Sequence, residues 1–178
     1  MTETSNERLS CGCPSTFPDW HKKDVNLAGH LVHGQKQSMF MHMPIGHEAK
    51  LDLQFKDMQR LDLHARWPGF VLSRSAMFRG QLLCLLSEEH SPARSVFCLP
   101  RPFNLRVALF HGDVADVRLS VAKMQSALLD EGKMPKSLFL AYLTCPRCQD
   151  ERGGMQVMLL RQWIANEKLY QKAKKAST

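Results

Sequence analysis

The cysteines are the residues of this 178-residue chain whose spacing most directly suggests chemistry. Cys11 and Cys13 form a Cys-Gly-Cys-Pro turn near the N-terminus, and Cys145 and Cys148 form Cys-Pro-Arg-Cys after an apolar run. A Cys-x-x-Cys turn places two thiolates about one metal's width apart, and two cysteine pairs complete a closed tetrahedral site. The sequence therefore predicts a Cys₄ zinc site that ties the N-terminal arm to the second half of the chain.

Other uses of these four cysteines stay open. Four thiolates also suit an iron–sulfur cluster, and a Cys-x-x-Cys pair after a strand is the placement found in thioredoxin-like redox proteins. The polar, glycine-rich segment 149–154 does not favour the helix that a thioredoxin-like motif needs. The two pairs can also be unrelated thiols. Cys84 and Cys98 stand inside apolar segments and are predicted to be core residues.

The histidines offer a second set of candidate ligands. His42 and His111 each end an apolar run at equivalent points of two similar segments. There they either hold a ligand or a haem iron, or satisfy carbonyl groups in a turn. Met39, Met41 and Met43 beside His42 suit Cu(I), although alternating methionines are more typical of a buried strand. No nucleophile elbow, phosphate-binding loop or His-Glu-x-x-His motif is present, so no catalytic set can be named.

The elements that must position these residues form two similar series. Segments 38–99 and 104–150 each have the periodicity of a strand, a helix and two strands. We expect an α+β fold with a mainly antiparallel sheet, both helices on one face, and a further C-terminal helix over residues 155–172. Residues 1–36 are predicted to be an arm that carries the first cysteines, and residues 37–178 a single domain.

The composition is that of an ordinary globular protein, with 44% hydrophobic and 23% charged residues. The net charge of +7 is concentrated after residue 160, where five basic residues face one glutamate, so we expect only nonspecific nucleic-acid contact from this tail. No apolar run reaches the roughly 18 residues that span a bilayer, and the polar N-terminus does not resemble a signal peptide. These features predict a cytoplasmic protein without a membrane partner.

Two stretches of the second half resemble a known family. Residues 106–113 (Arg-Val-Ala-Leu-Phe-His-Gly-Asp) and 138–146 (Leu-Phe-Leu-Ala-Tyr-Leu-Thr-Cys-Pro) are similar to the GyrI-like superfamily, which includes effector-binding domains of bacterial transcription activators. The resemblance covers about residues 38–145. The sequence departs from the family pattern in two ways. It lacks the DNA-binding helix-turn-helix of those activators, and it lacks the glutamate by which multidrug-binding members hold cations.

The resemblance implies a groove between the two repeats that binds a small molecule. The candidate lining residues are His42, Trp67, His111 and Tyr142. The favoured function is therefore a small-molecule-binding module stabilised by zinc. The alternatives are a hydrolase on the same scaffold, which some relatives are, or a haem, iron–sulfur or zinc-dependent interaction protein.

Overall fold

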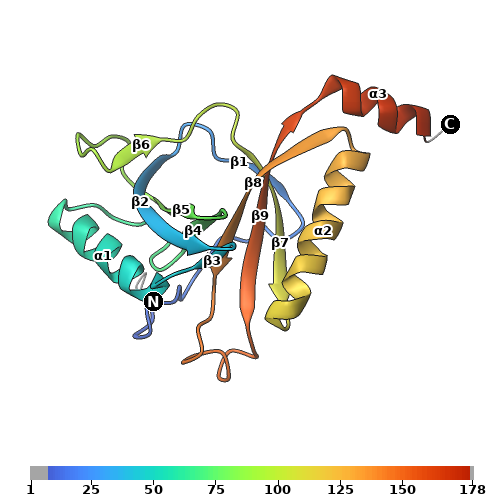
Figure 1. Ribbon diagram of the computed structural model, residues 1–178. Helices are drawn as coiled ribbons and strands as arrows, with labels where there is room; N and C mark the ends of the chain where they lie inside the picture. The colour runs from blue at the N-terminus through green and yellow to red at the C-terminus, as the bar shows by residue number, and fades with distance from the viewer. Residues whose placement is uncertain (1–7, 177–178) are drawn as a thin grey trace, which may run out of the picture.

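The computed structural model describes residues 8–176, which form one nine-stranded sheet and three helices (Figure 1). The strands and helices, in chain order, are β1 (Asp24–Asn26), β2 (Leu31–Phe40), β3 (Met43–Pro44), α1 (His47–Arg60), β4 (Val71–Ser75), β5 (Arg79–Leu85), β6 (Val96–Cys98), β7 (Asn104–His111), α2 (Val114–Asp130), β8 (Lys133–Tyr142), β9 (Gln156–Ala165) and α3 (Glu167–Ala176). No helix among these residues is long and apolar enough to cross a membrane.

The sheet is built from two equivalent halves. One half contains β2, α1, β4 and β5, and the other contains β7, α2, β8 and β9. The strand order is β1-β7-β9-β8-β4-β5-β2-β3, with β6 added beside β2, and every pairing is antiparallel. The halves join where β4 pairs with β8, through Ser73 opposite Leu140. The predicted pair of strand–helix–strand–strand repeats is therefore confirmed.

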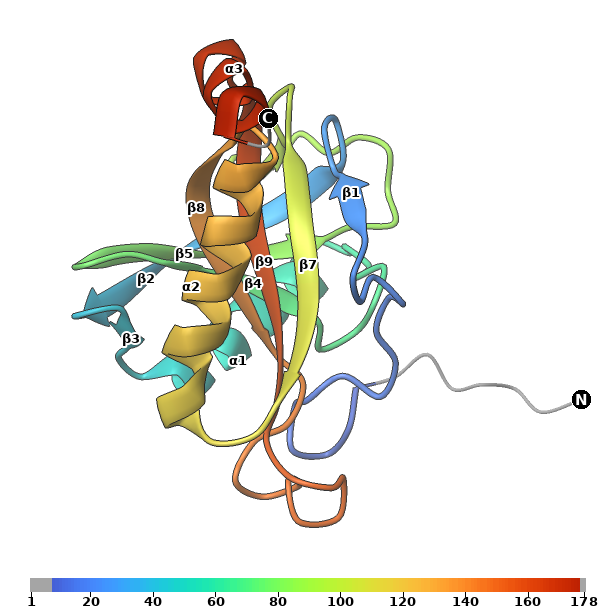
Figure 2. The ribbon, with the colours of Figure 1, turned by 90° about the vertical axis from the view of Figure 1, so that its right-hand side faces the viewer.

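Both large helices cover the same face of the sheet, as the sequence predicted. Val71 belongs to the apolar cluster under α1, and Ser73 lies two residues further on the same face of β4. Leu140, which is paired with Ser73, packs in the cluster under α2. The opposite face carries the largest core cluster, and the N-terminal arm packs against that cluster through Phe17 and Trp20. Figure 2 shows the path of the arm beside the sheet.

The helices form where the apolar spacing predicts them. In α2, Val117, Val121 and Met124 follow a spacing of four and then three residues and pack on the sheet. Asp113 caps the helix because its Oδ1 accepts a hydrogen bond from the Ala115 N–H at 3.3 Å. Gly132 then follows the helix at φ +72°, which only glycine adopts without strain.

The C-terminal helix predicted over residues 155–172 is wrong for most of its length. Residues 156–165 are β9, which pairs with β7 on one side and β8 on the other, and α3 begins only at Glu167. The segment 157–160 is buried on both faces of the sheet, so its apolar run carries no strand alternation. An unbroken run of this kind is compatible with a buried helix as well as a buried strand.

The boundary predicted after residue 36 also differs from the structure. It falls inside β2, and β1 already belongs to the sheet. The start of β2 was missed because its buried face carries polar side chains, His33 and Gln37, where an apolar pattern was sought. His33 is instead held by two polar side chains of α1. Its Nε2 lies 2.9 Å from Asp57 Oδ2, and Gln54 Nε2 donates to its carbonyl at 3.0 Å.

Candidate metal centre and adjoining pocket

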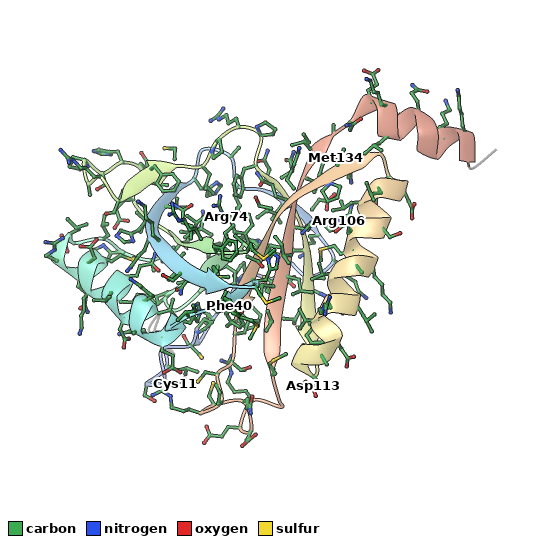
Figure 3. The ribbon with its side chains drawn as sticks, in the orientation of Figure 1. Cys11, Phe40, Arg74, Arg106, Asp113 and Met134 are labelled. Atoms are coloured by element: carbon green, nitrogen blue, oxygen red, sulfur yellow. The ribbon has the colours of Figure 1, made fainter. Side chains whose placement is uncertain are left out.

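The four cysteines predicted as ligands come together at one end of the sheet. The sulfurs of Cys11, Cys13, Cys145 and Cys148 all lie within 4.8 Å of one another. Two come from the arm and two from the loop that follows β8, and Figure 3 shows Cys11 beside that loop. Among the described residues all six cysteines are free thiols. Cys84 is buried in the core as predicted, whereas the prediction for Cys98 was wrong, because it is exposed at the end of β6.

The loop after β8 is shaped as one tight turn around a sulfur. The Cys148 and Gln149 N–H groups donate to the Cys145 carbonyl at 3.0 and 2.9 Å, and the Cys145 N–H donates to Cys148 Sγ at 3.4 Å. The Cys145 and Cys148 sulfurs lie 3.8 Å apart. A tetrahedral site with metal–sulfur bonds of about 2.3 Å has sulfur–sulfur edges of about 3.8 Å. This half of the cluster therefore already has the spacing that a zinc ion requires.

Hydrogen bonds from Arg152 and Arg147 hold the arm against this loop, and Gly69, just before β4, packs on the arm from another side. Arg152 Nη1 donates to the carbonyls of Pro14 at 3.1 Å and Leu143 at 2.7 Å. Arg147 Nη2 donates to the Cys11 carbonyl at 3.3 Å. Gly69 packs directly on the Cys13–Pro14 peptide, where a β-carbon would meet backbone atoms at 2.8 to 2.9 Å. The cysteines are thus positioned by contacts that do not depend on a metal.

The thiols of the cluster differ in their acidity. Burial raises the pKa of Cys13 far above its usual value, and hydrogen bonds to Cys145, Cys11 and Cys148 add to the rise. Burial opposes ionisation of Cys145 as well, but the Arg147 N–H and the Cys13 and Cys148 thiols donate to its sulfur and lower its pKa to about 7. Cys145 therefore ionises more readily than Cys13. A bound dication favours the thiolate form of every sulfur that ligates it.

A pocket of about 340 Å³ opens beside the cysteines. It lies between β3, the first two turns of α1 and the loop after β8, and the cluster itself forms one wall. Its lining combines the apolar side chains of Leu51, Phe55 and Val71 with several titratable groups. A volume of this size accommodates a small molecule.

His47 is a largely buried histidine that lines the pocket next to Tyr142. Its ring meets the Tyr142 ring edge-on, with the centroids 5.1 Å apart. Burial lowers the pKa of His47 below its usual 6.5, against the opposing effect of Glu48, so the imidazole is neutral near pH 7. The buried Nδ1 has no hydrogen-bond partner within residues 8–176. Burial also raises the pKa of Tyr142, which keeps its hydroxyl protonated.

Two long ion pairs connect α1 to the neighbouring segments at the pocket. Arg8 lies 3.9 Å from Asp52 and stacks 4.3 Å from the centre of the Phe55 ring. Arg147 lies 3.7 Å from Glu48. Because these side chains are largely exposed, the pairs contribute little stability. Their importance is that they place two cations and two carboxylates around one concave surface.

The ligand-lining residues predicted from the resemblance are not brought together. Only Tyr142 lines the pocket. His42 lies in the turn after β2 with its Nδ1 3.1 Å from Ser75 Oγ, and His111 is exposed at the end of β7. Trp67 packs edge-on to Trp20 at 5.3 Å, on the face opposite the helices. A binding role for each of them stays a prediction.

Sequence reasoning missed His47 and Glu48, the first two residues of α1. Neither belongs to a recognisable motif, and His47 was one of eight histidines. The only local signal was the helix start after Pro44 and Gly46. Ser75 was missed as well, because its proximity to His42 exists only after β2 and β4 enter the same sheet.

A protein-family model described as "Bacterial hydrolase" matches residues 2–163. The match covers most of the chain, and the protein therefore belongs to this family. Neither the curated proteins nor the solved structures gave a significant match. The predicted GyrI-like resemblance was wrong, because the family that matches is a different one. That resemblance rested on the order and lengths of the elements, which unrelated families can share.

Proposed function

We propose that the protein is a hydrolase and that its active site is the pocket beside the cysteine cluster. The observation that carries this proposal is His47, a neutral imidazole that lines the pocket and whose buried Nδ1 has no hydrogen-bond partner among residues 8–176. Titratable groups with shifted pKa values in a cleft are typical of active sites. Membership of the bacterial hydrolase family supports the same class of reaction.

In this proposal His47 acts as the general base. A neutral imidazole accepts a proton from a water molecule as that water attacks the scissile bond, a role that typically contributes 10²- to 10⁴-fold to the rate. Tyr142, protonated at neutral pH, is placed beside the His47 ring to donate a hydrogen bond to developing negative charge. Leu51, Phe55 and Val71 offer contact to an apolar part of the substrate.

The second candidate site is the Ser75–His42 pair, since a serine hydroxyl within 3.1 Å of an imidazole nitrogen is the start of a nucleophilic dyad. The two sites are distinguished by matched variants. Hydrolysis of a panel of chromogenic carboxylic esters, phosphomonoesters, phosphodiesters and anilides is measured for the wild type, His47→Gln and Ser75→Ala. We expect about a 100-fold loss of kcat for His47→Gln and wild-type rates for Ser75→Ala.

The reverse pattern would move the active site to Ser75 and His42. Equal rates in all three proteins would contradict a catalytic role both for His47 and for the Ser75–His42 pair. If no member of the panel is hydrolysed by the pure protein at any rate above that of buffer, the hydrolase proposal fails for these bond types.

We also propose that the cysteine cluster holds zinc. The 4.8 Å limit on the distances between the four sulfurs and the 3.8 Å edge between Cys145 and Cys148 support it. Four thiolates fill a tetrahedral ion completely, so the metal would fix the arm against the loop after β8 and leave the chemistry to the pocket. Free thiols in this arrangement also support a reducing, cytoplasmic location.

Elemental analysis tests the metal. Protein purified without added metal should contain about one equivalent of zinc, and its visible spectrum should lack the bands of haem and of iron–sulfur clusters. Iron in place of zinc would favour the cluster alternative. A metal-free protein with four rapidly titrating thiols would contradict a metal site.

A further inference from the structure

Two turns of the first half project together from one side of the molecule and expose apolar side chains. The turns are residues 40–45, which lead from β2 through β3, and residues 77–78, between β4 and β5. Together they form a surface that we call the apolar tip. Its six residues are between 49% and 66% exposed: Phe40, Met41, Met43, Ile45, Met77 and Phe78. Figure 2 shows the ends of β2, β3 and β5 extending away from the N-terminal side of the molecule.

The apolar tip is one surface, because hydrogen bonds join the two turns. The Met39 N–H donates to the Phe78 carbonyl at 2.9 Å, and the last pair of the β2–β5 ladder is Ser38 with Arg79. Gln37 Nε2 holds the β2–β3 turn closed by donating to the carbonyls of Ser38 and Ile45 at 2.9 and 2.7 Å. These bonds fix the backbone of both turns, so the turns themselves lose little conformational freedom on binding.

The structure differs from the prediction for these methionines. Their alternation predicted a buried strand, but only Met39 is buried, while Met41 and Met43 are exposed. The difference arises because β2 ends at Phe40, and the chain then turns back on itself at positive φ through Met41 and His42. The methionines after that point no longer face the core. Exposed, contiguous apolar side chains of this kind mark an interaction surface.

The charge around the apolar tip has one sign. Strands β2, β5 and β4 form a ribbon in which Gln81 of β5 is paired with Lys36 on one side and Arg74 on the other. Arg79 lies two residues from Gln81 on β5, so its side chain is on the same face. The three cations therefore share one face of the ribbon. Segments 34–47 and 71–81 contain no Asp or Glu, and none of the three cations forms an ion pair within the described part of the chain.

We propose that the apolar tip and its three cations dock the protein on the surface of an anionic phospholipid membrane. Phe and Met side chains on projecting turns enter the boundary between headgroups and acyl chains, while neighbouring Lys and Arg bind the phosphates. A second copy of this chain fits less well, since a symmetric pair would place the same cations against each other. The expectation of no membrane partner rested on the lack of a long apolar run and on the polar N-terminus, whereas the tip unites two short segments that are separate in the sequence.

Vesicle sedimentation tests the proposal. The full chain is mixed with vesicles of phosphatidylcholine alone or of phosphatidylcholine and phosphatidylglycerol in equal parts. We expect binding to the mixed vesicles only, weakened by added salt because exposed charges are screened. A Phe40→Ser, Phe78→Ser double variant should bind at least about tenfold more weakly, since two aromatic side chains are removed from the interface.

Matched controls separate the tip from the general positive charge of the protein. Lys36→Gln with Arg79→Gln removes two charges at the tip, and Lys174→Gln with Lys175→Gln removes two from α3. The first pair should weaken vesicle binding severalfold more than the second. Leu119→Ser, at an exposed apolar position on α2, should bind as the wild type does.

Three outcomes would overturn the proposal. The first is an absence of binding to the mixed vesicles. The second is equal loss for the tip and α3 charge pairs, which would indicate nonspecific attraction. The third is a concentration-dependent dimer in light scattering that the Phe40→Ser, Phe78→Ser variant dissociates, because the tip would then be an interface between copies.

Discussion

Gly69 lies so close to Pro14 that a β-carbon at position 69 would stand 2.8 Å from the Pro14 nitrogen. The Gly69 φ of +83° disfavours any other residue as well. Gly69→Ala should therefore push the arm away from β4 and lower the free energy of unfolding by roughly 3 kcal/mol, from backbone strain and overpacking together. Denaturant unfolding measures the loss, and zinc content should fall with it because the arm carries half of the ligands.

Gly153→Ala is the matched control for that experiment. Gly153 also has a positive φ, +77°, but a β-carbon there meets no atom within 4 Å. It should show the backbone strain alone, about 1 to 2 kcal/mol. Equal losses in the two variants would mean that contact with the arm is not what requires glycine at position 69.

Removal of a cysteine ligand should release the metal and destabilise the protein together. Cys13→Ser and Cys148→Ser each leave three thiols, and we expect less than about half an equivalent of zinc in either variant. Cys98→Ser, at an exposed cysteine outside the cluster, should keep the wild-type content. Elemental analysis and a thermal melt with and without a chelator provide the measurement. Zinc retention in both cluster variants would contradict the site.

The cluster of four cysteines could be predicted from the sequence because they come as two compact pairs, Cys-x-Cys and Cys-x-x-Cys. The four sulfurs can come together only if the arm reaches the end of β8. The structure shows that it does. The pocket could not be predicted in this way. His47, Arg8 and Tyr142 come from three separate segments, and burial, which sets the pKa of His47, exists only in the folded chain.

The fold shows the same division. Helix α2 could be recognised from the spacing of Val117, Val121 and Met124, because one face of the helix is exposed and the other packs on the sheet. Strand β9 could not be recognised from the sequence. It has a strand on each side and is covered on both faces, so residues 157–160 are all apolar and show no alternation of apolar and polar side chains. Periodicity identifies half-buried elements and fails for fully buried ones.

Acid should destabilise the protein through an ion-pair network at the start of β7 and β8. Arg106, labelled in Figure 3, pairs with Asp24 and lies 2.7 Å from Glu131, whose second cation is Lys133 at 2.6 Å. The hydrogen bonds from Arg106 and then Lys133 lower the pKa of Glu131 from 4.5 to about 2. A carboxyl with a depressed folded-state pKa stabilises the protein above its ordinary pKa, and this contribution is lost as the pH falls towards 2.

Glu131→Gln tests this contribution. The variant should be less stable than the wild type at pH 7, and the difference should shrink between about pH 5 and pH 2 as the wild-type carboxylate becomes protonated. Because Glu131 is 44% exposed, solvent screens the pair and the difference at pH 7 should stay below about 1 kcal/mol. Denaturant titrations across this range measure it. A difference that does not change with pH would assign the effect to packing.

The proposed role of His47 predicts the acid side of the pH–rate profile. A general base works only when deprotonated, so kcat/KM should fall as the pH drops through the His47 pKa. Burial lowers that pKa, which places the midpoint below 6.5 and keeps the enzyme active in mildly acidic solution.

Glu48 acts against burial by raising the His47 pKa. Glu48→Gln should therefore move the midpoint to still lower pH, since the carboxylate that favours the imidazolium is removed. Asp52→Asn removes a carboxylate of the same pocket that does not affect the His47 pKa, and its midpoint should equal that of the wild type. Equal midpoints in all three proteins, measured with the best substrate of the panel, would assign the acid limb to a group other than His47.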